Sequence, residues 1–293
     1  MVNGDRWHCI CLPVHMMATT TVLNKSPDAI GRRSRFVRQR TGKRLVLGQR
    51  DLEILRWLYR YRYLRQTHLQ RLLQPVSPKR FTERLGDLFH ETGLINRPSI
   101  QPPLFDARSS PMLYEITPSG IECLASHGAL PHRAVTFSRR SCRSYSPQFL
   151  HTMMIIETLL AIEQVTLETP GQRFVPVDEI IARAPQHVRH AHNPLAVPVT
   201  LVPNPKHSVI RKRHETIMIP DALYGIEYDI DGEKRYRFWA LECERASPAW
   251  RSRSDASSTA LKRAAYDALI EARTYRSHWG IPNLKLHLVT SGG

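Results

Sequence analysis

Apolar residues recur at every second position over two stretches of the chain that meet at Asp231-Gly232. This dipeptide favours the two-residue type I′ turn of a β-hairpin. The alternation on both sides of it predicts two antiparallel strands within residues 217–244. With Asp231 and Gly232 at the centre of the turn, Ile230 pairs with Glu233.

Counting outward from this turn places Asp221 opposite Glu242 if neither strand contains a bulge, and Glu244 lies on the same face as Glu242 because side chains alternate along a strand. Like charges set opposite each other destabilise strand pairing, and a divalent cation removes that conflict. Mg²⁺ or Mn²⁺ bound by carboxylates commonly also holds a substrate phosphate. We therefore predict that Asp221, Glu242 and Glu244 are catalytic metal ligands at a site for phosphodiester chemistry.

Residues 1–46 show no sustained periodicity, whereas from Leu47 onward apolar residues have helical spacing, followed by two short strand patterns. Ser77 is the predicted N-cap of the third helix, with Pro78 in its first turn. The predicted elements are helices at Asp51–Tyr61, at Thr67–Leu73 and from Pro78, strands at Leu94–Arg97 and Met112–Thr117, and a helix from Pro118 to His127.

The junction Tyr114-Glu115-Ile116-Thr117 before the last of these helices resembles that between wing and helix in winged-helix DNA-binding domains. In that fold the third helix enters the major groove, which makes Lys79, Arg80 and Arg84 the expected DNA-binding residues there. Glu83 and Asp87 give this helix a mixed charge. Winged helices also serve as protein-interaction modules, and this alternative stays open.

The second half of the chain has helix and strand patterns on both sides of the hairpin. These are a helix at Pro147–Glu168, a strand at Arg173–Ile180, an irregular segment at 184–215, a helix at Ser257–Arg276 and a strand at Leu284–Thr290. This order, with Pro220-Asp221 and Glu242-Cys243-Glu244, resembles the α-β-β-β-α-β core of PD-(D/E)XK nucleases, the restriction-endonuclease-like fold. Glu244 stands where most members have lysine.

The length of 293 residues suits a two-domain α+β or α/β protein. We expect a basic arm at 1–46, a winged helix at 47–128, a linker at 129–146 and a nuclease-like domain at 147–293. Lys and Arg number 42 against 26 Asp and Glu, a net charge of +16, which favours DNA as partner. The arm is either a disordered tail or a segment that orders on DNA.

Five scattered cysteines without paired spacing indicate reduced thiols and a cytoplasmic location. The apolar runs are too short to predict a membrane span. A second basic cluster is predicted to contact DNA phosphates. It comprises Lys206, Arg211, Lys212 and Arg213. The nearby spacing His187-x-x-His190-x-His192 is a weaker candidate for a transition-metal site.

Lys262 and Tyr266 lie four residues apart and share one face of the predicted helix after Glu244. The pair resembles the helix motif of RecB-type nucleases, in which these side chains lie beside the metal carboxylates. The alternative is a solvated lysine and a tyrosine that only packs. In the catalytic interpretation, Lys262 stabilises negative charge on the scissile phosphate, and Glu244 is a ligand or general base.

The combined layout, with His151 and Glu157 on the helix at 147–168, resembles the replication-relaxation family, which includes C-type (MOBC-like) mobilisation relaxases of plasmids. The resemblance implies strand nicking at a plasmid or mobile-element origin, with relaxosome or transfer proteins as partners. It also adds His151 and Glu157 to the catalytic residues. Tyr266 is the nearest tyrosine to the site, but the sequence does not identify a covalent nucleophile.

Two functions from other classes remain compatible with the sequence. The first is an origin-binding replication or transcription factor whose nuclease-like domain is inactive, favoured by the missing lysine of the motif. The second is a protein-only adaptor, which predicts no salt-dependent affinity for DNA, in conflict with the charge of +16.

Overall fold

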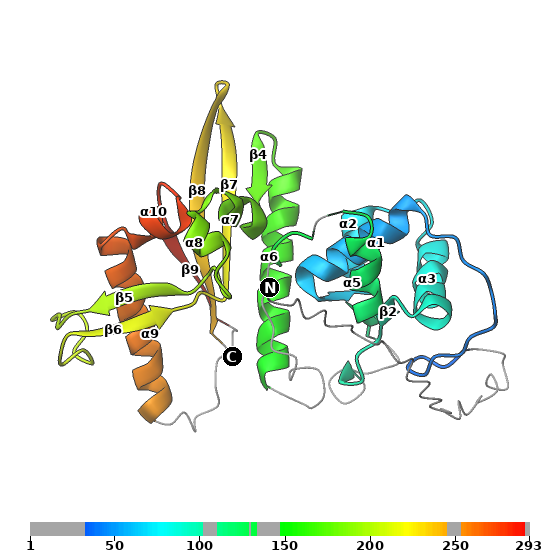
Figure 1. The fold of residues 1–293 in the computed structure, drawn as a ribbon, viewed down its shortest axis with the longest axis horizontal. Coiled ribbons are helices and arrows are strands. Elements are labelled where there is room, and N and C mark those ends of the chain that lie inside the picture. Colours follow the sequence, from blue (N-terminus) through cyan, green and yellow to red (C-terminus); the bar gives the residue numbers. More distant parts are fainter. Residues whose placement is uncertain (1–32, 102–109, 129, 134–146, 245–252, 291–293) are drawn as a thin grey trace, which may run out of the picture.

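The computed structural model of the protein describes residues 33–101, 110–128, 130–133, 147–244 and 253–290. Its fold is mixed α+β, with helices packed around several small sheets. A long central helix, α6 (Pro147–Glu168), lies between an N-terminal and a C-terminal group of elements (Figure 1). Most of the expected linker at 129–146 lies outside the described residues.

The N-terminal group contains helices and a three-stranded antiparallel sheet of order β1-β3-β2. Its elements are α1 (Gln49–Tyr61), β1 (Tyr63–Arg65), α2 (Gln66–Leu73), α3 (Pro78–Asp87), the π-helical turn η1 (Leu88–Thr92), β2 (Ile95–Asn96), β3 (Leu113–Ile116) and α5 (Pro118–Ala125). The predicted helices and strands of this group are confirmed. The short strand β1 was not predicted from the sequence.

Helix α3 begins as its sequence predicts. The hydroxyl of Ser77 accepts a hydrogen bond from the backbone N–H of Arg80 at 3.4 Å, and Pro78 occupies the first turn. The helix continues into η1, after which Gly93 adopts a left-handed φ of 74°. That conformation strains residues with a Cβ atom and therefore favours glycine, and a Cβ atom here would also lie 2.7 Å from Nη1 of Arg38 and displace this guanidinium.

Residues 33–46 of the basic arm lie along α3 and η1, in contrast to the expectation of a disordered tail (Figure 1, dark blue coil). Arg33 pairs with Asp87 at 3.0 Å and with Glu91 at 3.1 Å, and Lys43 pairs with Asp87 at 2.6 Å. These contacts neutralise two neighbouring carboxylates, which explains why a strongly basic segment is held on the protein.

The C-terminal group is built on a four-stranded sheet of order β4-β7-β8-β9 and a separate two-stranded ribbon. Strands β8 and β9 are parallel, and the other neighbours in the sheet are antiparallel. The elements are β4 (Gln172–Val175), α7 (Val177–Arg183), α8 (Gln186–Arg189), β5 (Val197–Leu201), β6 (His214–Met218), β7 (Ala222–Ile230), β8 (Glu233–Glu244), α9 (Arg253–Glu271), α10 (Thr274–Trp279) and β9 (Lys285–Thr290).

The strand predicted at 173–180 and the helix predicted at 257–276 are both interrupted. Pro176 is the N-cap of α7, so β4 ends at Val175. The last helix breaks at Arg273, whose φ of 54° is left-handed, and α10 follows. Neither break is signalled by the apolar spacing on which those predictions relied.

The segment 184–215 is not irregular, because it contains α8 and most of the ribbon of β5 and β6. Val197, Val199 and Leu201 are buried and alternate with exposed positions, a pattern that predicts a strand. Ile217 and Met218 pair with β5 and do not extend β7. The hairpin of β7 and β8 is therefore shorter at its N-terminal end than the sequence predicts.

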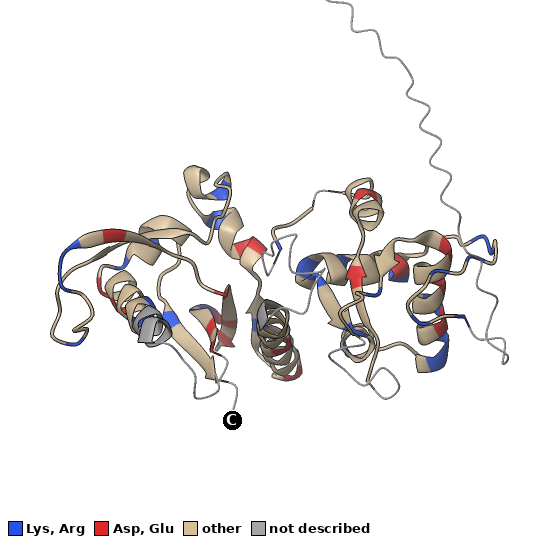
Figure 2. Cartoon of the chain, turned by 90° about the horizontal axis from the view of Figure 1, so that it is seen from below, with Lys and Arg blue, Asp and Glu red and all other residues tan. Residues whose placement is uncertain are grey.

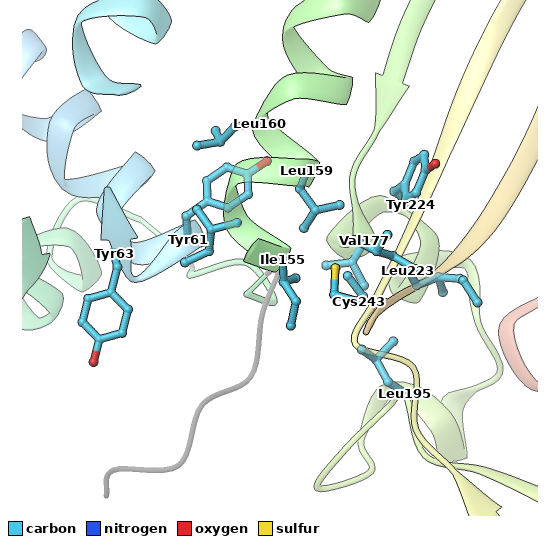
Figure 3. Close-up of a cluster of buried hydrophobic side chains, with 14 of the residues drawn as sticks. Tyr61, Tyr63, Ile155, Leu159, Leu160, Val177, Leu195, Leu223, Tyr224 and Cys243 are labelled. Atoms are coloured by element: carbon cyan, nitrogen blue, oxygen red, sulfur yellow. The ribbon is translucent and has the colours of Figure 1, made fainter. Parts of the chain in front are cut away.

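Helix α6 connects the two groups through apolar side chains on opposite sides (Figure 3). Leu160 points toward Tyr61 of α1, whereas Ile155 and Leu159 point toward Val177 and Cys243 in the C-terminal group. Buried residues of both groups belong to a single continuous core. The orientation of α6 therefore decides which of its polar side chains face each group.

Among the described residues, α6 alone is long and apolar enough to cross a membrane by length and composition, over Phe149–Glu168. This finding differs from the expectation that the apolar runs of the sequence are too short for a membrane span. Glu157 and Glu163 of this helix pair with Arg65 and Arg60 of the N-terminal group. Because α6 packs against protein on both sides, we interpret it as a core helix.

Candidate functional site

The hairpin turn and the register of β7 and β8 are confirmed. Asp231 and Gly232 have φ angles of 54° and 82°, as a type I′ turn requires. Ile230 is paired with Glu233, and Ala222 with Leu241 at the far end of the hairpin, so no bulge interrupts it. The backbone N–H of Asp221 donates to the carbonyl of Leu241 at 3.1 Å, and Asp221 thus lies across from Glu242.

Glu242 is buried near the end of β8, with 4% of its surface exposed. The hydroxyl of Tyr266 donates to Oε1 of its carboxylate, and the ammonium of Lys262 donates to Oε2. Lys262 and Tyr266 lie one turn apart on α9, which is why both reach the same acid. The predicted association of this helix pair with the acidic residues is present in the structure.

Asp221 is held by three groups from different parts of the chain. Its Oδ2 accepts the backbone N–H of Cys243 at 2.9 Å. Its Oδ1 lies 3.3 Å from Nε2 of His151 on α6 and 3.9 Å from Nζ of Lys262. The structure therefore brings together His151, Asp221, Glu242, Lys262 and Tyr266.

The two central carboxyl groups have pKa values shifted in opposite directions. Burial raises the pKa of Glu242 to about 7, and the adjacent charge of Asp221 adds to this effect. Burial acts on Asp221 in the same sense, but the hydrogen bond from His151 and the charge of Lys262 hold its pKa below the usual value. Neighbouring carboxyl groups whose pKa values are shifted in opposite directions are typical of catalytic sites in which one acid stays protonated while its neighbour is ionised.

Glu244, the third predicted ligand, is directed to a different partner. Its Oε2 lies 3.4 Å from Nη2 of Arg263, which was not among the predicted site residues although it follows Lys262 directly. Within the described ranges, no three or more His, Cys, Asp or Glu side chains are arranged to hold a metal ion. This includes the predicted set of three carboxylates and the histidines near 190.

Asp221 and Glu242 nevertheless converge on one positive charge, the Lys262 ammonium. Their oxygen atoms are hard ligands of the kind that Mg²⁺ and Mn²⁺ take. As arranged, the four oxygens of this pair contact His151, the Cys243 N–H, Tyr266 and Lys262. The donor chemistry of the pair fits a divalent cation, but the predicted participation of Glu244 does not follow from the geometry.

Glu157 is separated from the cluster. Its Oε1 accepts a hydrogen bond from Nε of Arg65 at 3.1 Å, on the side of α6 that faces the N-terminal group. His151 lies on the side that faces the sheet. Six residues correspond to about one and two-thirds turns of an α-helix, so the two side chains cannot share a face.

Most residues predicted to bind DNA are exposed, in one group on α3 and another between β5 and β6, and Arg84 is the exception. Lys79 and Arg80 are exposed in the first turn of α3. Arg84 is instead tied to Asp51 at 2.5 Å and to the carbonyl of Val46 at 2.7 Å. Lysine and arginine are coloured blue in Figure 2, which shows them on α3 and at the tip of the β5–β6 ribbon at the opposite end of the molecule.

The basic loop between β5 and β6 lies beside the helix that carries Lys262. Lys206, Arg211, Lys212 and Arg213 are all exposed. Within the same loop, Nε2 of His207 contacts Oδ2 of Asp267 at 2.7 Å, one position after Tyr266 on α9. This contact, which the sequence did not predict, holds the basic loop on the helix of the candidate site.

The comparisons with known proteins place the chain in a family. A family model described as replication-relaxation matches residues 55–284, from within α1 to the residue before β9, and so includes every residue of the cluster. Neither a curated protein nor a solved structure matches the chain. Since the family model covers well over half of the 293 residues, the chain belongs to the replication-relaxation family.

Proposed function

We propose that this protein binds DNA at a plasmid or mobile-element origin and cuts one strand at the cluster around Asp221. Membership of the replication-relaxation family indicates a role in plasmid replication or mobilisation. The observation that carries the cutting activity is the convergence of His151, Asp221, Glu242 and Lys262 from α6, the β7–β8 hairpin and α9. A MOBC-like mobilisation relaxase is the specific form of this proposal.

The N-terminal group is proposed to be a winged helix that positions the protein on DNA. Its order of helix, strand, two helices and two further strands, with sheet order β1-β3-β2, supports that assignment. In this fold α3 is the helix that enters the major groove. Lys79 and Arg80 are then the exposed cations at its leading end, whereas Arg84 serves the internal pairing with Asp51.

The C-terminal group is proposed to be a PD-(D/E)XK-like nuclease core. The support is a long helix, three antiparallel strands and a helix that leads into a fourth, parallel strand. The acids lie at the end of the central hairpin, beside α9. The ribbon of β5 and β6 is an insertion into that order, and its exposed basic loop is suited to contact the backbone of the DNA being cut.

The residues of the cluster have distinct chemical capacities in this proposal. His151 is one-third exposed and its Nε2 faces the Asp221 carboxylate, which orients the imidazole for proton transfer. Lys262 has 42% of its side chain exposed, so its ammonium is able to approach a phosphate and stabilise developing negative charge. Glu242, with a pKa of about 7, exchanges a proton near neutral pH. Glu244 pairs with Arg263 at the edge of the site.

Mg²⁺ or Mn²⁺ is part of the proposal. Asp221 and Glu242 are the carboxylates that would hold it, and it would supply polarisation of the scissile phosphate. Tyr266 is proposed to position Glu242, since its buried hydroxyl is bonded to that acid. Relaxosome or transfer proteins are the partners that the relaxase assignment implies.

The direct test is cleavage of supercoiled DNA that carries the origin of the protein's own element, with Mg²⁺ or Mn²⁺ present. We expect the unsubstituted protein to produce nicked circles and Asp221→Ala to lose this activity. Glu215→Ala is the matched control, because Glu215 is an exposed acid of β6 outside the cluster. Equal behaviour of all three proteins, with DNA bound and not cut, would contradict the enzyme proposal.

That contrary result would favour a DNA-binding replication or transcription factor on an inactive nuclease-like fold. One observation supports this second candidate: each oxygen of Asp221 and Glu242 already contacts a protein group. An inactive site retains such contacts as packing. The two candidates share DNA binding and differ only in whether Asp221 is needed for cleavage.

A further inference from the structure

The described part of the basic arm, residues 33–46, contains six basic residues and no acidic residue. Arg33, Arg38 and Lys43 are directed toward the protein. Arg38 donates to the backbone carbonyls of Phe89 at 3.0 Å and Ile95 at 2.9 Å. The arm is therefore packed against the N-terminal group, and it contacts α3, the helix proposed to bind DNA.

The contacts of Arg33 and Lys43 neutralise the acidic end of that helix. Asp87 is 7% exposed, and burial favours its neutral form, but hydrogen bonds from Lys43 and Arg33 hold its pKa below the usual value. The pKa of Glu91 is lowered against burial in the same way, by hydrogen bonds from Thr41 and the charge of Arg33. Both acids thus remain ionised, and each is matched by a cation of the arm.

The other three cations of the arm, Arg35, Arg40 and Arg44, are exposed. None of them has an ion-pair partner among the residues that the structure describes. They lie on a segment that contacts the last turn of α3 and the turn η1. The first turn of α3 exposes Lys79 and Arg80. The N-terminal group therefore has exposed cations both at the start of α3 and on the arm, and the arm pairs with the carboxylates at the end of α3.

We propose that residues 33–46 complete the DNA-binding surface of the N-terminal group. Arg33 and Lys43 remove the repulsion that Asp87 and Glu91 would exert on the phosphates, and the three exposed guanidinium groups contact the DNA backbone. The inference rests on the proposed DNA-binding function, and adds to it a second element of the chain. It does not depend on whether the protein cuts DNA.

The first test measures the affinity for an origin duplex at several salt concentrations. Affinity falls as salt rises, and each lost phosphate contact makes the slope of log affinity against log salt less steep by about one. The triple variant Arg35→Ala, Arg40→Ala and Arg44→Ala should therefore have a slope that is less steep by about three. The matched control removes the same charge at the other end of the molecule, by changing the exposed Arg189, Arg273 and Arg276 to alanine.

An equal loss of slope in the two triple variants would overturn the proposal, because net charge alone would then explain the affinity. An unchanged slope in the arm variant would also overturn it, while leaving DNA binding by α3 and the basic loop intact. A failure of the unsubstituted protein to bind DNA would contradict the proposed function itself, which makes the two failures distinguishable.

The second test isolates the counter-charge role of Arg33 and Lys43. Changing both to alanine should weaken DNA binding by about tenfold, because two carboxylates are then unmatched beside the phosphates. Adding Asp87→Asn and Glu91→Gln should restore the affinity, since no charge is left to repel DNA. Persistently weak binding by this fourfold variant, with a cooperative thermal transition retained, would overturn the counter-charge role.

Discussion

The hydroxyl of Tyr266 donates a hydrogen bond to the buried carboxylate of Glu242, across the contact between α9 and β8. Only 1% of the surface of Tyr266 and 4% of that of Glu242 are exposed. A tyrosine that attacks a phosphate must present its oxygen to the DNA, whereas this oxygen is enclosed between the helix and the sheet. The pair therefore indicates a positioning role for Tyr266, exerted through Glu242.

Tyr266→Phe should retain nicking activity and move its pH profile to higher pH. The hydrogen bond from Tyr266 lowers the pKa of Glu242, which is about 7 with that bond present, so its removal raises the value further. The measurement is the nicking rate against pH, with Tyr275→Phe, a buried tyrosine of α10, as control. Complete loss of nicking together with loss of a protein–DNA adduct would instead identify Tyr266 as the nucleophile.

Glu242→Gln should change how stability depends on pH. The pKa of Glu242 in the folded protein, about 7, exceeds its ordinary value of 4.5, so its contribution to stability is complete below pH 4.5 and is lost as the pH rises through 7. Glutamine does not titrate. The free energy of unfolding of the unsubstituted protein should therefore fall relative to the variant by about 3 kcal/mol across this range.

Urea unfolding of both proteins at a series of pH values measures this difference, and the shared titrating groups cancel in the comparison. Parallel stability curves for the two proteins between pH 4.5 and 8 would show that Glu242 does not have a raised pKa.

His151→Gln and Glu157→Gln should differ sharply, although both residues were predicted to be catalytic. His151 contacts Asp221, and loss of a proton-transfer group typically lowers a rate by about 10² to 10⁴-fold. Glu157 pairs with Arg65 on the far side of α6, where the pair is partly exposed and its loss costs about 1 kcal/mol or less. Nicking rates of the two variants, compared with their melting temperatures, test the separation. An equally inactive, well-folded Glu157→Gln protein would contradict it.

Addition of Mg²⁺ or Mn²⁺ should raise the melting temperature of the folded protein. A ligand that binds only the folded state at one hundred times its Kd stabilises it by about 2.7 kcal/mol. Asp221→Asn should abolish the response, whereas Glu244→Gln should retain most of it, because Glu244 is paired with Arg263 outside the central pair. An equal response in Asp221→Asn would place any bound ion elsewhere.

Glu163→Ala should destabilise the junction between the two groups of elements. Glu163 is buried on α6, accepts a hydrogen bond from Tyr61 at 2.6 Å, and lies 3.3 Å from Arg60. Nε and Nη2 of Arg60 are buried without a hydrogen-bond partner, so removing the carboxylate leaves the cation uncompensated. A loss of about 3 kcal/mol is expected from chemical denaturation. A change below 1 kcal/mol would show that this network does not hold the groups together.

Much of the candidate site follows from local sequence. Asp231-Gly232 and the alternation around it determine the turn and the register, and the register determines that Asp221 lies opposite Glu242. Spacing by four along a helix determines that Lys262 and Tyr266 share a face. These relationships are short-range in the chain, or transmitted by a regular ladder of hydrogen bonds, so pattern alone is sufficient to predict them.

The tertiary structure decided the relationships between distant segments. The apolar residues of helix α6 are not confined to one face, so its sequence does not specify which side meets the sheet. Packing alone placed His151 against Asp221 and Glu157 against Arg65. Packing likewise decided that Arg84 pairs with Asp51 and that the arm pairs with the carboxylates of α3 and η1. Sequence thus determined which groups the hairpin and α9 offer to the site. Long-range packing determined which of the other predicted residues join the site. The reason is that each charged side chain pairs with whichever partner the packing of the core brings near it.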